Sequence, residues 1–209
     1  GTYRHDTFFG HMSGEDGSPE KRLLGHGQLS NMIKTWGTTG LAGVWAEGNT
    51  RESLHDALAR KETFGTSGTR IRARFFGGWD YKAGDHQGDN VGKTGYEKGV
   101  PMGSDLTARP DRAKTPTFIV QAEKDSDAAN LDRIQIIKGW AKHGQSFEKI
   151  YNVAWSGVRS PDPKSGRLPP VGNTVNIAEA RYSNTIGSEN LSAVWQDPDF
   201  DPALRAFYY

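Results

Sequence analysis

Residues 131–155 contain the clearest fold signal, with the sequence LDRIQIIKGWAKHGQSFEKIYNVAW. Two segments rich in β-branched and aromatic side chains, residues 131–140 and 147–155, flank the polar stretch 142–146. A glycine in a short polar stretch between two such segments is typical of a hairpin turn. We therefore predict an antiparallel β-hairpin over these residues.

Three further segments of the C-terminal half have the composition of strands, namely residues 118–122, 175–182 and 191–196. Prolines between residues 161 and 170 form a stiff linker between the hairpin and the last two strands. Residues 202–209 are expected to begin a helix. Together these segments predict an antiparallel β domain over residues 116–209, either a sheet or a sandwich.

One helix is predicted in the N-terminal part. Asn49 is a favoured N-cap residue, and Glu52 follows three residues later, as in a capping box. Apolar residues then recur at helical spacing over residues 54–59, and two cations follow near the C-terminal end. We expect the helix to begin after Asn49 and to end before residue 65.

A strand and a long loop are predicted next. Residues 70–75, RIRARF, alternate strictly between cationic and apolar side chains, as a half-buried strand does, and Gly77 and Gly78 are expected to end it. Residues 81–115 are rich in Gly, Asp and Lys and predict a long Gly-rich loop. The fold class is therefore α+β and β-rich, with a short helical N-terminal part over residues 1–80.

The composition excludes several classes of function. Lys and Arg number 26 against 25 Asp and Glu in the 209 residues, and this net charge of +1 gives no general attraction to nucleic acid. The absence of cysteine excludes disulfides, zinc–thiolate sites and thiol catalysis, but leaves the localisation unknown. No apolar segment approaches the roughly 18 residues that a spanning helix needs, so we expect no membrane span.

Several long motifs identify a family resemblance by their order along the chain. They are GLAGVWAEGNTRESL (40–54), KETF (61–64), SGTRI (67–71), AEKD (122–125), NLDRIQ (130–135), KGW (138–140), LPPVGNTV (168–175) and DPDFDP (197–202). Over residues 18–209 the chain resembles the C-terminal part of DUF3604, a family of uncharacterised proteins.

The resemblance implies a larger protein whose N-terminal portion is similar to the PHP-type metallohydrolases. Those enzymes bind divalent metals through an early His-x-His motif and a later Asp-x-His motif. None of the six histidines here has another histidine two positions away, and His5-Asp6-Thr7-Phe8 lacks a histidine after the aspartate. We therefore expect the metal centre upstream of residue 1, no cofactor in this fragment, and a divalent metal only in the full-length family.

This implication also gives residues 1–80 a structural role, as the closing segment of a PHP-like barrel. The chain alone would then be an inactive part of a metal-dependent, phosphoesterase-like hydrolase that acts on a small anionic substrate. Glu47 and Arg51, at the start of the predicted helix, are the catalytic candidates, because such chemistry needs carboxylates as bases or as partners of metal ligands. The alternative is a simple ion pair between them across the helix start.

The strand 70–75 supplies an anion-binding candidate. Arg70, Arg72 and Arg74 share one face at intervals of about 6–7 Å. Guanidinium groups bind phosphate or sulfate through two parallel hydrogen bonds, so the row predicts an anionic ligand. The alternative, which we favour, is a solvent-facing strand whose arginines pair with Asp or Glu of a neighbouring strand.

The other polar clusters are better explained by structure than by chemistry. A metal site built from His5, Asp6, His11, Glu15 and Asp16 has no recognised ligand spacing. Asp197, Asp199 and Asp201 alternate like calcium ligands, but Pro202 occupies the position where an EF-hand loop has glycine, so we predict a turn. Trp140, Trp155 and Trp195 lie in predicted strands, where aromatic side chains usually form the core.

Two functional hypotheses besides the hydrolase stay open at this point. One is a non-catalytic β-sandwich that binds a glycan or an anionic ligand through strand aromatics or the arginine row. The other is a structural domain that forms oligomers because its interrupted core leaves apolar surface exposed.

Overall fold

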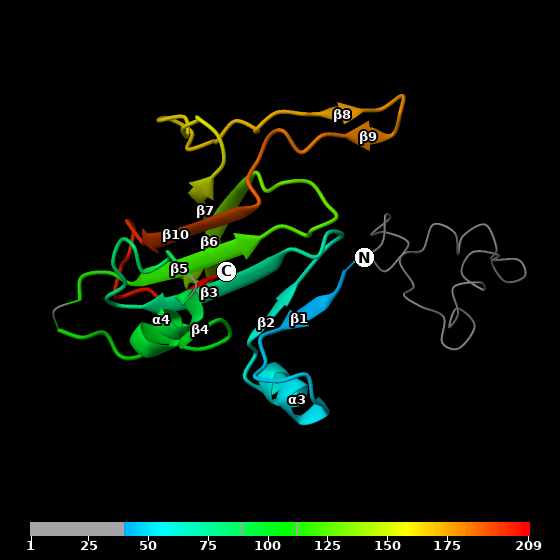
Figure 1. Cartoon of the computed structure of the whole chain (residues 1–209). Coiled ribbons are helices and arrows are strands. Elements are labelled where there is room, and N and C mark those ends of the chain that lie inside the picture. The colour runs from blue at the N-terminus through cyan, green and yellow to red at the C-terminus, as the bar shows by residue number, and fades with distance from the viewer. Residues whose placement is uncertain (1–39, 89, 112) are drawn as a thin grey trace, which may run out of the picture. The chain divides into compact units, whose positions relative to one another are not determined.

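The computed structural model describes residues 40–88, 90–111 and 113–209 (Figure 1). These residues fall into two units. Residues 40–43 and 65–70 belong to the first unit, and residues 44–64 and 71–209 belong to the second. The candidate metal ligands between His5 and Asp16 lie outside the described residues.

The second unit contains a four-stranded antiparallel sheet in the order β10-β5-β3-β4. Its strands are β3 (Arg72–Gly78), β4 (Gly99–Pro101), β5 (Thr117–Glu123) and β10 (Asn190–Gln196). The register places Phe76 opposite Ile119 and Leu191 opposite Ala122. The predicted strands 118–122 and 191–196 are confirmed as β5 and β10. Strand β3 pairs with β5 in the same sheet, although about 40 residues separate the two strands in the sequence.

The prediction that Gly77 and Gly78 end a strand is wrong. Both glycines lie within β3 and pair with β5. A Cβ atom on Gly77 would lie 2.9 Å from Leu106 Cδ2 and 3.2 Å from the ring of Phe118. Glycine is therefore used here because side chains of neighbouring segments press against the strand backbone.

The predicted loop over residues 81–115 is wrong in its centre. This segment contains the helix α4 (Val91–Lys98) and the strand β4 that follows it. The helix packs against β3 so closely that a Cβ atom on Gly95 would lie 2.5 Å from the ring of Phe76. Its two glycines hide the helix in the sequence, because glycine lowers helix propensity, and here they permit the close packing.

A second, three-stranded antiparallel sheet has the order β11-β6-β7. The predicted hairpin is confirmed as β6 (Arg133–Lys142) and β7 (Gln145–Trp155). His143 and Gly144 form the turn with φ of 52° and 76°, as a type I′ turn requires. The helix expected from residue 202 onward is wrong, because Ala206–Tyr208 forms the strand β11 and pairs with β6.

Residues 175–182 form a small separate hairpin rather than one strand. Its two arms are β8 (Val175–Asn176) and β9 (Arg181–Tyr182), and Ala180 between them has a φ of 50°. The side chains of Val175 and Ile177 are exposed. Because these side chains bury little apolar surface, the segment gains little from a long regular strand.

The two larger sheets pack face to face through one hydrophobic cluster. Its buried members are Phe118, Val120, Ala122, Leu131, Ile134, Ile136 and Ala154. Strands β5 and β6 each contribute alternate residues to this cluster, as the pleat of a strand dictates. The β-rich α+β class is confirmed, and the two larger sheets, which include β3 and β4 from the first half of the chain, form a two-layer antiparallel structure within the second unit (Figure 1).

The helix α3 (Arg51–Ala59) confirms the helix predicted after residue 49, with a different cap. Thr50 is the N-cap, and its hydroxyl accepts a hydrogen bond from the Ser53 amide. The flanking strands β1 (Ala42–Val44) and β2 (Thr63–Gly65) pair with each other. Glu52 therefore does not form the expected capping box with Asn49.

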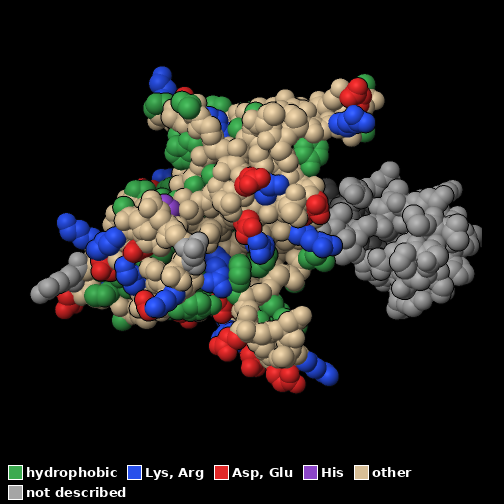
Figure 2. Space-filling view, in the orientation of Figure 1, with side chains coloured by type: hydrophobic (Ala, Val, Ile, Leu, Met, Phe, Trp, Pro, Cys, Tyr) green, Lys and Arg blue, Asp and Glu red, His purple; other side chains and the backbone are tan. Residues whose placement is uncertain are grey.

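None of the helices in the described residues is long and apolar enough to cross a membrane. On the face shown in Figure 2, cationic and anionic side chains intermingle over the second unit.

Candidate functional site

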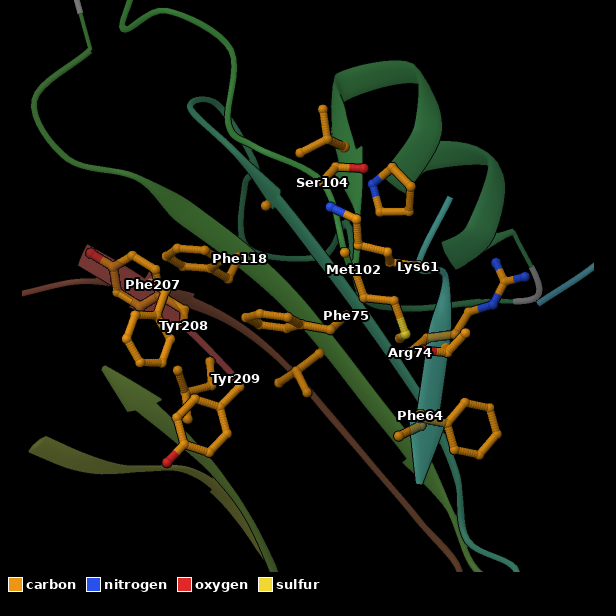
Figure 3. A pocket seen from close by; sticks show the side chains of 18 of the residues that line it. Lys61, Phe64, Arg74, Phe75, Met102, Ser104, Phe118, Phe207, Tyr208 and Tyr209 are labelled. Atoms are coloured by element: carbon orange, nitrogen blue, oxygen red, sulfur yellow. The ribbon is translucent and has the colours of Figure 1, made fainter. Parts of the chain in front are cut away.

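A pocket of about 660 Å³ opens in the second unit at the edge of β3. Strand β4 covers β3 only from Phe76 to Gly78, and just before it the Phe75 carbonyl accepts a 2.9 Å hydrogen bond from the Met102 amide. The two sheets, the end of α3 and the loop after β4 complete the walls. We call this the aromatic pocket, defined by Phe75, Phe118 and Tyr208 on one side and by Lys61 and Met102 on the other (Figure 3).

The aromatic side of the pocket is a stack of rings. The rings of Phe75 and Phe118 are parallel within 8°, with centroids 5.4 Å apart. Tyr208 lies 4.5 Å from Phe118, and Trp195 supports Phe118 from behind at 5.6 Å. Offset and tilted rings of this kind form a rigid apolar wall, because each ring is held by its neighbours.

The hydroxyl group of Tyr208 points away from a ligand and into the protein. It donates a 2.7 Å hydrogen bond to Oδ2 of Asp197, which is completely buried. Burial, followed by this hydrogen bond, raises the pKa of Tyr208 far above its ordinary value, so the phenol stays protonated. The pocket therefore meets the ring of Tyr208 and not its hydroxyl group.

The buried carboxylate of Asp197 is in turn neutralised by a cation. Lys138 Nζ lies 2.6 Å from Asp197 Oδ2 and donates to the backbone oxygen of Asp199 at 2.7 Å. At the more exposed end, Asp199 accepts hydrogen bonds from Lys149 and Tyr151. The hydrogen bond from Lys149, followed by that from Tyr151, lowers the pKa of Asp199 below its usual value. These bonds fix the β11 wall of the pocket to β6.

Trp45, which is not a lining residue of the pocket, covers part of the edge of β3. Its indole N–H donates a 2.8 Å hydrogen bond to the Ala73 carbonyl, which has no strand partner on that side in the described residues. The guanidinium carbon of Arg74 lies 3.9 Å above the Trp45 ring and 5.9 Å from that of Tyr96. Arg74 is thus held by cation–π contacts.

A buried carboxylate, Glu62, binds the hydroxyl of the same tyrosine whose ring Arg74 approaches. Glu62, only 3% exposed, accepts a hydrogen bond from the Tyr96 hydroxyl and lies 3.6 Å from Arg60. Burial, followed by the hydrogen bond to Glu62, raises the pKa of Tyr96 to about 12. Glu62 is therefore satisfied by Tyr96 and Arg60, and it does not pair with Arg74.

Lys61 lies at the C-terminal end of α3 and lines the pocket. It has the left-handed φ of 59°, and a Cβ atom on Gly103 would lie only 2.2 Å from its carbonyl oxygen. The loop after β4 therefore packs directly on the Lys61 backbone. Figure 3 shows the Lys61 side chain extending toward Ser104.

The structure separates most of the sequence-predicted site residues. Glu47 and Arg51 are exposed, neither lines the aromatic pocket, and no ion pair joins them in the described part of the chain. Arg72 pairs with Glu123 on β5, which is the neighbour-pairing alternative for this row. Arg70 lies in the first unit, so Arg74 alone of the five lines the pocket.

Sequence reasoning missed Lys61, Phe75, Phe118 and Tyr208 as lining residues of one pocket, and it missed Trp45 as the residue that packs on Arg74. Trp45 and Lys61 both belong to family motifs, and this was the one signal available for them. No local pattern connects them to Phe118 or Tyr208, because the pocket is assembled from segments that extend from residue 61 to residue 209.

The residues of the described part do not fit a metal centre. Within residues 40–88, 90–111 and 113–209, no group of three or more His, Asp or Glu side chains could hold a metal ion. Asp197 and Asp199 instead bind lysines and tyrosines, and Asp201 accepts a hydrogen bond from the Ala203 amide. These aspartates lie in the predicted turn, and Asp197 also forms a buried ion pair with Lys138.

Comparison with known protein families gives a match over nearly the whole chain. The model of a family described as "Protein of unknown function (DUF3604)" matches residues 2–209. Neither a curated protein nor a solved structure matches the chain.

Proposed function

The chain belongs to the DUF3604 family, and from the aromatic pocket we propose that its second unit is a ligand-binding module for a small organic molecule with a flat apolar body. The observation on which the proposal rests is the parallel pair of Phe75 and Phe118 beside the Tyr208 ring. A concave, mostly apolar site with a few polar groups at its edge is the usual form of a small-molecule site.

Rigidity of the pocket walls supports this proposal. The Tyr208 hydroxyl is held by Asp197, and the Phe118 ring packs against both Phe75 and Trp195. Side chains that are already fixed lose little conformational entropy when a ligand binds, so more of the contact energy appears as affinity.

Of the two ligand classes predicted from the sequence, a glycan fits the pocket less well. A sugar needs hydrogen-bond partners for several hydroxyl groups, because a buried hydroxyl without a partner is costly. Here the aromatic side offers only rings, and the Tyr208 hydroxyl is already bound to Asp197. The proposal therefore favours a ligand whose body is an aromatic ring system.

The hydrolase chemistry implied by the family resemblance stays a prediction. It requires a divalent metal, for which the described residues offer no ligand set. We therefore derive no reaction step through a metal and assign no catalytic role to Glu47 or Arg51.

Direct binding measurements test the proposal. We expect 2-naphthol, indole or 2-naphthalenesulfonate to bind saturably in isothermal titration calorimetry and to raise the melting temperature by mass action. Ser104→Trp should block the pocket, because Ser104 is exposed and lines it. The matched control, Ser126→Trp, introduces the same side chain at an exposed position outside the pocket. The proposal is wrong if none of the three probes binds, or if Ser104→Trp leaves binding unchanged.

A further inference from the structure

We infer that the ligand of the aromatic pocket is a short extended peptide, which pairs as an added strand with the open edge of β6 and places an aromatic side chain beside Tyr208. This inference rests on the proposed function, because the aromatic side chain of the peptide is then the flat apolar body of the ligand. It goes further by naming the class of ligand and the backbone groups that recognise it.

One edge of β6 is open where this strand borders the pocket. Strand β6 has 10 residues, but the 3 residues of β11 pair only with its second half. Tyr209 extends this pairing by one position, because its backbone exchanges hydrogen bonds of 2.8 and 3.0 Å with that of Ile137. In the described part of the chain, no strand lies on this side of β6 beside residues 133–136.

The backbone of Gln135 faces this open edge. In an antiparallel pair, every second residue directs both its N–H and its C=O group to the same neighbouring strand. Gln135 is in phase with Ile137, whose backbone binds Tyr209, so the Gln135 backbone points to the side where β11 has ended. The register shift in the hairpin leaves this phase unchanged, because the extra residue, Val153, lies on β7. A free donor and acceptor at a strand edge form a template for another strand.

A strand added at this edge would direct alternate side chains into the pocket. Ile134, Ile136 and Tyr208 belong to the core cluster or pack against it, and all three line the pocket. Directly opposite residues of an antiparallel pair share one face, so residues opposite Ile134 and Ile136 would also face inward. An aromatic side chain opposite Ile136 would lie beside the Tyr208 ring, which contacts Phe118 (Figure 3).

Continuity with the pairing of β11 favours a peptide over a free aromatic compound. Strand addition gains affinity from main-chain hydrogen bonds and specificity from pockets that accept alternate side chains. A free aromatic compound would fill the pocket but leave the Gln135 backbone without a strand partner. A peptide satisfies the backbone and the ring stack together, and it extends the interface that β11 and β6 already form.

Calorimetric titration with the uncharged peptide acetyl-Thr-Phe-Thr-Val-Thr-amide tests this inference. We expect saturable binding, competition by 2-naphthol, and about tenfold weaker binding when the central threonine is N-methylated, because one main-chain donor is lost. The isomer acetyl-Thr-Thr-Phe-Val-Thr-amide has the same composition without the alternation and should also bind more weakly. In hydrogen–deuterium exchange, the Gln135 amide should gain protection when the first peptide is bound.

A matched pair of variants tests the same backbone group from the side of the protein. Gln135→Pro removes the N–H donor at an edge position, where proline is tolerated, and should weaken peptide binding about tenfold. Gln135→Ala keeps the N–H group and removes only the side chain, whose amide donates to Asn152, so it should bind like the wild type. If Gln135→Pro does not fold, the N-methylated peptide still tests the inference with the unchanged protein.

The outcomes separate the two proposals. Binding of the flat probes without binding of the peptide would disprove the strand inference and leave the binding module intact, whereas no binding of either kind would disprove both. Equal affinity for the peptide and its N-methylated form would also overturn the inference, because the main chain would then not be recognised. Concentration-dependent sedimentation that Gln135→Pro abolishes would overturn it in favour of a second copy of the chain at this edge.

Discussion

At the scale of single residues, Lys138 and Asp197 form an ion pair that is buried in the interior. Their side chains are 4% and 0% exposed, and their charged atoms lie 2.6 Å apart. Lys138 occupies an inward position of β6, in phase with Ile134 and Ile136, so an apolar residue would be expected there. The lysine is tolerated because Asp197 and the Asp199 carbonyl both accept hydrogen bonds from it.

We expect Asp197→Asn to lower the free energy of unfolding by about 3–5 kcal/mol, because it leaves the Lys138 ammonium buried without a counter-charge. Lys138→Met should have a similar effect by leaving the carboxylate unpaired. The double variant Lys138→Met with Asp197→Leu should recover much of this loss. Urea unfolding monitored by tryptophan fluorescence measures all three.

Lys149→Met provides the control for this prediction. Lys149 also pairs with an aspartate, Asp199, but both side chains are about half exposed. An exposed pair contributes about 0–1 kcal/mol, so this variant should unfold close to the wild type. Equal effects of Lys149→Met and Asp197→Asn would mean that burial of the Lys138 pair contributes nothing.

The sequence indicates only part of this arrangement. The alternation of Asp197, Asp199 and Asp201 predicts a turn, which the structure contains. Their burial and their partners depend on β6, whose Lys138 lies 59 residues earlier in the chain. A contact over that separation leaves no local periodicity.

At the scale of elements, hydrogen bonds at the start of α3 explain why Thr50 is the N-cap residue. Two side-chain hydrogen bonds fix this start: the Thr50 hydroxyl accepts from the Ser53 amide, and the Ser53 hydroxyl accepts from the Gly48 amide. Asn49, one residue earlier, is also a good capping residue by type. Side-chain type alone therefore does not distinguish the two positions.

We expect Thr50→Ala to destabilise α3 by about 1 kcal/mol, since the Ser53 amide loses its acceptor. Asn49→Ala is the matched control and should have little effect. Hydrogen–deuterium exchange of the α3 amides, measured for both variants, checks the prediction. Faster exchange in Asn49→Ala than in Thr50→Ala would show that the cap lies at Asn49.

The sequence predicted some elements better than others, because some have local signals and others form only with distant partners. The hairpin of β6 and β7 was predicted because two segments of strand composition and the turn signal between them occur within 25 consecutive residues. The helix α4 and the strand β11 were missed because their formation depends on partners. Gly95 allows α4 to lie against Phe76, and β11 is a three-residue strand held by β6.

At the scale of the whole molecule, the candidate site was the least predictable feature. Arg74 alone among the predicted site residues lines the pocket. The alternation of residues 70–75 placed Arg74 on one face of a strand, but it gave no information on which neighbour covers that face. Trp45 over Arg74 and Glu123 beside Arg72 are consequences of tertiary packing.

Buried tyrosine hydroxyls make the free energy of unfolding of the whole fold depend on pH in the alkaline range. The chain has seven tyrosines, and the pKa values of Tyr81, Tyr151 and Tyr208 are raised far above the ordinary value, with burial as the largest cause. The pKa of Tyr96 is raised to about 12. In an unfolded chain these groups would ionise near pH 10.

We therefore expect the free energy of unfolding to fall as the pH rises above about 10, because the unfolded chain then releases phenolic protons that the folded chain keeps. Tyr81, which is only 4% exposed and donates to the Gly95 carbonyl, should contribute a slope of up to about 1.4 kcal/mol per pH unit. Phenolate absorbance should increase in two steps, the second coinciding with the loss of circular dichroism. In Tyr81→Phe the fall should be less steep, whereas Tyr182→Phe, at an exposed position, serves as the control. If all tyrosines of the folded protein ionise in one step near pH 10, the pKa values of the buried tyrosines are not raised. The free energy of unfolding would then not fall at alkaline pH for this reason.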